Sequence, residues 1–253
     1  AYHALQLQFN HVAVATAILH TPETPHFVAA AEVLAKSIRN FEKEIPVVAF
    51  VEEPVEHRFI SRLKAVGFEV VVVDVSWVPK GAEIAGMKAS IFGHNAWNKV
   101  LVIDADAMVV SELRGLFDQD IEDIAAAPEV HAPTRFNPGV MLVRTSLRLG
   151  LHARRVIRDG SFGVEQGDIF NGMFPGWFQS SPSHRLPLAY NVPSCLGELN
   201  GLGGEFYRTS AKIIHFYNFA SPQNPWEGIS TKRGTADVLA VLYWAIWFRG
   251  MLS

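Results

Sequence analysis

The fold is decided by the stretch Val100-Leu101-Val102-Ile103-Asp104-Ala105-Asp106, in which four apolar residues are followed by two acids. The apolar run has the composition of a buried β-strand. In extended geometry, Asp104 and Asp106 leave the backbone on the same side, so both carboxylates can converge on one cation. The stretch predicts a metal site at the end of a strand. Taken alone, it also allows the nucleophile of a phosphatase or a pair of solvated loop acids.

The composition is that of an ordinary globular protein. The chain has 253 residues, 49% of them hydrophobic, which suffices for one large domain or two small ones. Charged residues make up 19% and the formal net charge is -3, so no broad basic field exists and nucleic acid is not an expected partner. The only cysteine is Cys195, which excludes an internal disulfide and a cysteine-rich zinc cluster.

The sequence also bears on location. Without a disulfide pair or an Asn-x-Ser/Thr acceptor, the chain suits a reducing compartment, and we expect it in the cytoplasm. The Golgi lumen is the alternative, if an upstream anchor has been removed. The most apolar stretch, Ala236 to Phe248, is far short of the roughly 20 residues that a membrane-spanning helix needs.

Upstream of the two acids, apolar strand-like runs alternate with helical patterns. This alternation predicts a mostly parallel sheet covered on both faces, and ligands bind outside the carboxyl ends of strands in such sheets. Asp104 and Asp106 lie at such an end. The expected strands are Val12 to Leu19, Val47 to Val51 and Glu69 to Val75, and the expected helices begin at Thr24-Pro25 and cover His57 to Val66, with Gly67 as a left-handed cap.

A helix carrying Lys88 is expected between Lys80 and Ala96, just before the central strand. A lysine there either faces solvent or, if the segment borders the two acids, neutralises phosphate oxygens next to a metal ion. The residue pattern alone leaves both interpretations open.

The second half changes character. Val140 to Val143 reads as a strand introduced by a turn at Phe136-Asn137-Pro138-Gly139, and Gly139 indicates a close backbone approach. A helix is expected from Leu147 to Arg158, short strand-like runs at Pro187 to Asn191 and Lys212 to His215, and a closing helix that contains Leu239, Leu242 and Ile246.

Two further positions carry candidate chemistry. Glu165 and Gln166 sit near the expected start of a helix, where they form a simple capping turn or contact a sugar hydroxyl. His215 ends an apolar run, so it is either a core histidine or, beside two aspartates, the third ligand of an oxygen and nitrogen site suited to manganese.

Four motifs in one order carry a resemblance to a known family. They are Asn98-Lys99-Val100-Leu101-Val102-Ile103-Asp104-Ala105-Asp106, Phe136-Asn137-Pro138-Gly139-Val140, Glu165-Gln166-Gly167 and Lys212-Ile213-Ile214-His215-Phe216. Their order and spacing, with Lys88 at the matching distance, resemble the glycogenin-type family of retaining glycosyltransferases over roughly Val12 to Trp247. The resemblance implies a single GT-A domain over residues 1–253, with a Rossmann-like nucleotide-sugar-binding half at 1–110 and an acceptor-binding half at 111–253.

The resemblance also implies roles for matching positions. Asp104, Asp106 and His215 are expected to bind Mn²⁺, and Lys88, Glu165 and Gln166 to act at the reaction centre. The expected donor is a UDP-sugar, with glucose as first choice and galactose as second, and the expected acceptor is a carbohydrate, polyol or glycoconjugate. The positions expected to bind the donor are Thr16, Phe27, Lys88, Asp104, Ala105, Asp106, Asn137, Gly139 and Gln166.

This sequence departs from the family pattern in places. Asn224 stands where many members have a lysine that contacts the diphosphate, and Lys232 or Arg233 is a candidate to compensate. The segment after Tyr190-Asn191 lacks the tyrosine that self-glucosylating members modify, which favours a separate acceptor. Two other functions stay open: a catalytically weak relative that binds a nucleotide sugar, and a haloacid-dehalogenase-type phosphohydrolase with Asp104 as nucleophile.

Overall fold

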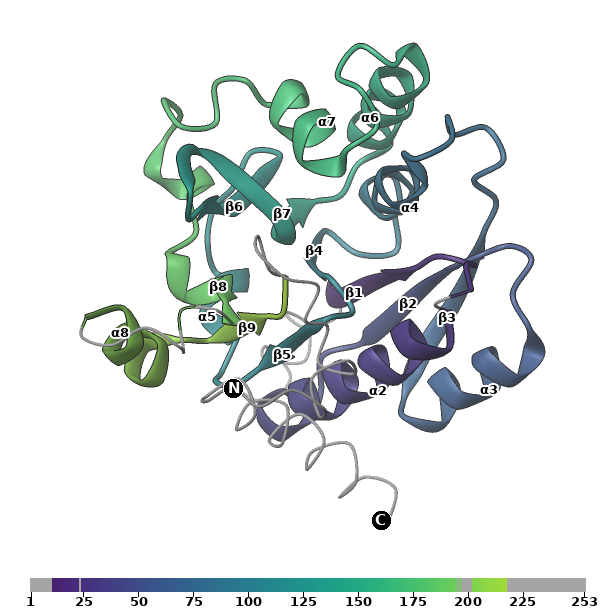
Figure 1. Cartoon of the computed structure of the whole chain (residues 1–253), viewed down its shortest axis with the longest axis horizontal. Coiled ribbons are helices and arrows are strands. Elements are labelled where there is room, and N and C mark those ends of the chain that lie inside the picture. Colours follow the sequence, from purple (N-terminus) through teal and green to yellow (C-terminus); the bar gives the residue numbers. More distant parts are fainter. Residues whose placement is uncertain (1–10, 23, 195, 197–201, 218–253) are drawn as a thin grey trace.

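The computed structural model describes residues 11–22, 24–194, 196 and 202–217, and its central feature is a mixed six-stranded sheet (Figure 1). The strand order is β3-β2-β1-β4-β7-β6. The first four strands are parallel, and β7 and β6 are antiparallel to their neighbours. The strands are β1 (Val12–Ile18), β2 (Val47–Glu52), β3 (Phe68–Val73), β4 (Lys99–Ile103), β6 (Ile124–Glu129) and β7 (Ala132–Arg144). The expected mixed, mostly parallel sheet is therefore confirmed.

Helices cover both faces of this sheet. In Figure 1, α2 and α3 lie on one side and α4, α6 and α7 on the other. All seven residues of β1 are buried, and successive ones enter opposite hydrophobic clusters: Val14 packs with the α2 side and Ala15 with the α4 side. The helices are α2 (Thr24–Phe41), α3 (His57–Ala65), α4 (Glu83–Phe92), α5 (Arg114–Phe117), α6 (Leu147–Asp159), α7 (Gln166–Met173) and α8 (Leu202–Ser210).

A second, three-stranded sheet stands beside the first. It has the order β5-β9-β8, from strands β5 (Ala107–Val109), β9 (Ile213–His215) and β8 (Val192–Pro193). Because β5 begins directly after Asp106 and pairs with β9, the register sets Ala107 opposite His215. The second sheet thus brings the end of the described chain back to the two acids.

Most expected elements of the first half are confirmed within a few residues. Gly67 has a φ of 90° after α3, which is the left-handed region that favours glycine, and it donates its N–H to the Lys64 carbonyl as the expected cap. The helix expected around Lys88 is α4, and the helix expected from Leu147 is α6.

Two predictions in the second half were wrong. Phe136-Asn137-Pro138-Gly139 is not a turn: it lies inside β7, which starts at Ala132, where Phe136 pairs with Pro128 of β6 beside a register shift. Pro187 to Asn191 is not a strand: it contains a 3₁₀ turn, Leu188–Tyr190, and the strand follows at Val192. A second 3₁₀ turn lies at Pro182–His184.

Some predictions lie outside the described residues. These are the closing helix around Leu239, Leu242 and Ile246, the altered loop with Asn224, and the compensating Lys232 or Arg233. Among the described residues, no helix is both long enough and apolar enough to cross a membrane.

Candidate active site

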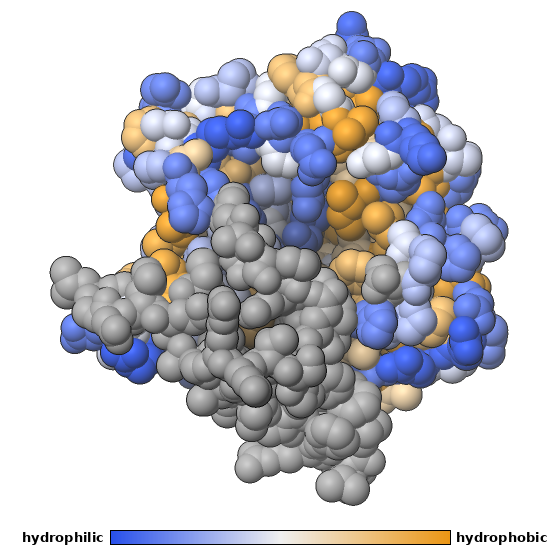
Figure 2. Space-filling model, viewed as in Figure 1, coloured by the Kyte–Doolittle hydropathy of each residue, from blue (hydrophilic) through white to orange (hydrophobic). Residues whose placement is uncertain are grey.

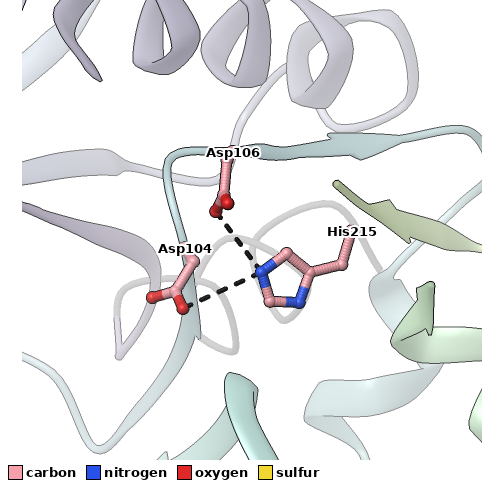
Figure 3. A group of neighbouring side chains, drawn as sticks. All are labelled: Asp104, Asp106 and His215. Atoms are coloured by element: carbon pink, nitrogen blue, oxygen red, sulfur yellow. Dashed lines mark ion pairs between the residues drawn. The ribbon is translucent and has the colours of Figure 1, made fainter. Parts of the chain in front are cut away.

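Asp104, Asp106 and His215 form a compact group at the junction of the two sheets. Each offers one ligand atom, and these atoms all lie within 4.8 Å of one another. His215 Nε2 is 3.3 Å from Asp106 Oδ1 and 3.9 Å from Asp104 Oδ2. Figure 3 shows one ring nitrogen facing both carboxylates while the other points away. The structure thus brings together the three residues that the sequence predicts as metal ligands.

Backbone pairing explains why these residues meet. Asp104 follows β4 and donates its N–H to the Gly139 carbonyl at 2.8 Å, while Phe216 donates its N–H to the Asp106 carbonyl at 2.9 Å. A Cβ at position 139 would overlap the imidazole of His215. Only glycine allows β7 to run this close to His215, so the close approach expected at Gly139 is confirmed.

The donor set fits a divalent metal ion. Carboxylate oxygens together with one imidazole nitrogen suit manganese and its neighbours, and the three groups converge from strand ends rather than from mobile loop tips. Burial alone would raise the pKa of Asp106, but the charge and hydrogen bond of a protonated His215, a backbone hydrogen bond and the charge of Lys88 outweigh it and lower the pKa below its usual range. A lowered pKa favours the carboxylate anion, which is the form that binds a metal ion.

Lys88 is the most buried charged group beside this site. Its side chain is fully buried, and its Nζ contacts Asp104 Oδ1 at 2.7 Å, Gln166 Oε1 at 2.7 Å and the Pro138 carbonyl at 2.8 Å. An ammonium group has three protons, so all of its donors are used within the protein. The interpretation of Lys88 as a solvent-facing residue is therefore wrong. Its ammonium group links α4 to Asp104, to β7 through the Pro138 carbonyl and to α7 through Gln166.

Two pockets meet at the acidic pair. The larger has a volume of about 480 Å³ and the smaller about 250 Å³, and both are lined by Asp104, Asp106 and Gln166. The space-filling view shows a hollow near the centre of this face, where hydrophilic and hydrophobic residues meet (Figure 2). The smaller pocket is completed by Ala17, Leu19, Phe27, Ile84 and Ala105; the larger is completed by Glu129, His131, Ala132, Arg135, Phe136, Asn137, Pro138, Gly167, Asn171, His215 and Tyr217.

The larger pocket contains a chain of polar side chains. Asn137 donates from Nδ2 to Glu129 Oε2 at 2.8 Å, and its Oδ1 accepts the N–H of Gly139 at 2.8 Å and Nδ2 of Asn191 at 3.0 Å. Asn191 Oδ1 lies 2.9 Å from His215 Nδ1, and the Tyr217 hydroxyl donates to Glu129 Oε1 at 3.1 Å. A continuous hydrogen-bonded path therefore leads from the pocket wall to His215.

Not every predicted position faces a pocket. Phe27 and Ala105 line the smaller pocket, Asn137 lines the larger and Gln166 lines both. Glu165 and Thr16 are not among the residues that line these two pockets. Glu165 is the exposed N-cap of α7 and makes no side-chain capping bond. The side chain of Thr16 is buried within β1, and its Oγ1 has no hydrogen-bond partner among the described residues.

Three residues of the polar chain went unpredicted: Glu129, Asn191 and Tyr217. Glu129 ends the strand-like run Ile124-Ala125-Ala126-Ala127-Pro128-Glu129, and an acid at the end of an apolar run is the same signal that identifies Asp104. That signal could have found Glu129. Asn191 and Tyr217 carry no comparable local pattern.

Comparison with known proteins gives a consistent result. The chain is 29% identical to human glycogenin-2 over 62% of its length and 26% identical to human glycogenin-1 over 89%. It spans 33% of the former and 70% of the latter. No family model matches the chain.

Two solved structures share the fold. The glycosyltransferase GlyE of Streptococcus pneumoniae TIGR4 superimposes with a TM-score of 0.64 at 19% identity, covering 93% of this chain and 60% of that one. An active-site mutant of LgtC gives a TM-score of 0.62 at 16% identity, covering 94% and 95%. The chain is thus glycogenin-like in sequence and has the GT-A fold, as the resemblance implies.

Proposed function

We propose that the chain is a metal-dependent glycosyltransferase that moves a hexose from a UDP-sugar to the hydroxyl group of a separate acceptor. The observation that carries the proposal is the position of Asp104, Asp106 and His215, at the junction of two pockets in a GT-A fold. Similarity to glycogenins favours glucose as the sugar, with galactose second. Carbohydrates, polyols and glycoconjugates are the candidate acceptors.

The two pockets suit the two ends of such a donor. The smaller one has largely apolar walls and an aromatic ring, Phe27, that a nucleobase can stack on. The larger one offers amide, carboxylate and hydroxyl groups to sugar hydroxyls and has room for part of an acceptor. Asp104 and Asp106, common to both, then lie beside the diphosphate.

The chemistry follows from charge. Cleavage of the bond between the sugar and the diphosphate leaves negative charge on the departing oxygen. Asp104, Asp106 and His215 would hold a divalent cation, which supplies Lewis-acid stabilisation of that charge. Lys88 keeps Asp104 and Gln166 in place and adds a fixed positive charge next to the site.

Gln166 is the best placed of the predicted reaction-centre residues. It lines both pockets, and its Oε1 is held by Lys88, which leaves its NH₂ group as the donor for a sugar or acceptor oxygen. Retention of configuration, with the acceptor hydroxyl entering on the face that the diphosphate leaves, is part of the proposal. A catalytic role for Glu165 and a uridine contact for Thr16 stay predictions.

A thermal-shift panel tests the proposal directly. UDP, UDP-glucose, UDP-galactose, UDP-N-acetylglucosamine and UDP-glucuronate are each added with Mn²⁺ or with EDTA. A ligand at 100 times its Kd stabilises the folded state by about 2.7 kcal/mol, so a true donor raises the melting temperature only with Mn²⁺. If no uridine nucleotide shifts the melt, the proposal fails.

Turnover separates the remaining alternatives. Release of UDP from a UDP-sugar in the presence of Mn²⁺ is the result expected of a transferase. Binding of UDP with Mn²⁺ but no sugar loss over long incubation would identify a catalytically weak relative. Release of phosphate from a simple ester without any nucleotide would identify a phosphohydrolase.

A further inference from the structure

In the hydrogen-bonded path to His215, each donor and each acceptor can be assigned. The assignment starts at the outer end of the path, where one group can only donate and another can only accept. The backbone N–H of Gly139 can only donate, and it points at Asn137 Oδ1 at 2.8 Å. The carboxylate of Glu129 accepts, and it lies 2.8 Å from Asn137 Nδ2. The amide of Asn137 therefore has one orientation, with its oxygen toward Gly139.

The orientation of Asn191 follows from that of Asn137. Asn137 Oδ1 is an acceptor, so the Asn191 atom 3.0 Å from it must be the amide nitrogen. The amide oxygen of Asn191 then faces His215, 2.9 Å from Nδ1. An amide oxygen has no proton, so the proton of this hydrogen bond belongs to His215 Nδ1.

This proton decides what the other ring nitrogen can do. A neutral imidazole with a proton on Nδ1 has its lone pair on Nε2, and Nε2 is the atom that faces Asp106 and Asp104 (Figure 3). Without an acceptor at Nδ1, the two carboxylates would favour the opposite tautomer, because an Nε2 proton can be donated to Asp106 at 3.3 Å. A proton at Nε2 would exclude a metal ion from that nitrogen.

We infer that Asn191, oriented by Asn137 and Glu129, is a positioning residue that keeps the proton of neutral His215 on Nδ1 and so leaves Nε2 open for a metal ion. The inference rests on the metal site of the proposed function. Asn191 is 1% exposed and His215 is 3% exposed, so water does not readily replace Asn191 as the acceptor. Outer partners of this kind typically change metal affinity by about 10–100-fold when removed.

Imidazole ¹⁵N spectra test the tautomer in the unaltered protein. The chain has ten histidines, so the His215 signals are assigned from their loss in His215→Gln, and spectra are collected upward from pH 7 until the neutral form is reached. The expected result is protonated Nδ1 and unprotonated Nε2. If neutral His215 carries its proton on Nε2 instead, the inference is overturned, whether or not the protein transfers sugar.

Metal binding by variants tests the consequence. Asn191→Leu is expected to weaken Mn²⁺ binding about 10–100-fold, measured by titration calorimetry without nucleotide. Its ¹⁵N spectra are expected to show the Nε2-protonated tautomer of His215 as well. Asn191→Asp keeps an acceptor at Nδ1 but sets a second oxygen against Asn137 Oδ1, so it is expected to keep the Nδ1-protonated tautomer and to recover the affinity only in part. Ser37→Ala is the matched control. It also removes a buried side-chain hydrogen bond, the one that Ser37 Oγ accepts from the N–H of Val109 in β5. Ser37 lines neither of the two pockets.

The outcomes separate the two proposals. Unchanged Mn²⁺ affinity in Asn191→Leu, or equal losses in Asn191→Leu and Ser37→Ala, would overturn the role of Asn191 while leaving the transferase intact. If the unaltered protein itself does not bind Mn²⁺, the metal site of the proposed function fails, and the role of Asn191 in metal binding fails with it.

Discussion

The two pockets that meet at Asp104 and Asp106 differ in the chemistry of their walls. The smaller is shaped by apolar side chains from the N-terminal half, with Phe27 of α2 and Ile84 of α4 among them. The larger is lined by polar side chains of β6, β7 and α7, together with Ala132, Phe136 and Pro138 of β7. An apolar wall selects by shape and stacking, while a polar wall selects by the positions of hydroxyl groups. If the proposed function holds, this difference predicts nucleotide binding in the smaller pocket and sugar discrimination in the larger one.

Removal of a shared ligand is expected to disable both pockets. Asp106→Asn should lower Mn²⁺-dependent release of UDP about 1,000-fold, since groups that stabilise transition-state charge are worth about 10²–10³ in rate. The melting temperature should stay nearly unchanged, because the side chain is 19% exposed and keeps its shape. Asp120→Asn, at a side chain 97% exposed, is the control. Full activity in Asp106→Asn would refute the assignment of Asp106 as a metal ligand.

Lys88→Met is expected to damage stability as well as activity. The substitution leaves Asp104, Gln166 and the Pro138 carbonyl without their common donor, and loss of one partner of a buried pair costs about 3 kcal/mol. Urea unfolding measures this loss, and UDP release measures the activity. Lys64→Met, on the exposed side of α3, should change neither. A stable Lys88→Met with normal turnover would show that the three contacts are dispensable.

Phe27→Ala is expected to weaken nucleotide binding in the smaller pocket without changing metal binding. Base stacking on an aromatic ring is worth about 1–3 kcal/mol, so the Kd for UDP should rise about 10-fold while the affinity for Mn²⁺ alone is unchanged. Calorimetry with UDP and with Mn²⁺ gives both values. Phe41→Ala is the matched control, since Phe41 ends the same helix and is 39% exposed. Equal effects of the two substitutions on the Kd for UDP would contradict the assignment of the nucleobase to the smaller pocket.

The smallest expected effect lies in the larger pocket. Tyr217→Phe removes the hydroxyl that donates to Glu129 Oε1, and one such hydrogen bond is worth about 0.5–1.5 kcal/mol. The kcat/KM for the UDP-sugar should fall about 3-fold, with the Kd for UDP unchanged. Tyr207→Phe is the control, because its buried hydroxyl has no hydrogen-bond partner among the described residues. A change in UDP affinity alone would contradict the division of roles between the pockets.

The half that forms the smaller pocket was largely predictable from the sequence. Strands β1 and β2 are continuous apolar runs buried on both sides, and the helices of this half begin and end at capping signals such as Thr24 and Gly67, so local pattern and tertiary structure agree. Asp104 and Asp106 stand at the end of such a run, which is why the metal site could be proposed before its geometry was known.

The half that forms the larger pocket was less predictable, because long-range pairing there outweighs local preference. Asn137-Pro138-Gly139 has the residues of a turn, yet β7 continues through it: Pro138 lacks an N–H and contributes only its carbonyl, which accepts from Lys88. Tyr217 and Glu129 are 88 residues apart in the chain, and no local pattern announces such a contact. The contact between Tyr217 and Glu129 could not be predicted because it exists only after the sheets assemble.

The pairing of Ala107 with His215 has a consequence for folding. Because His215 reaches Asp106 through the pairing of β9 with β5, a contact between segments far apart in the sequence, we expect the third ligand to join the acidic pair late in folding. A metal ion at this site would then bind only the fully folded chain. We therefore expect Mn²⁺ to lower the unfolding rate more than it raises the folding rate. Stopped-flow traces with and without Mn²⁺ measure both rates.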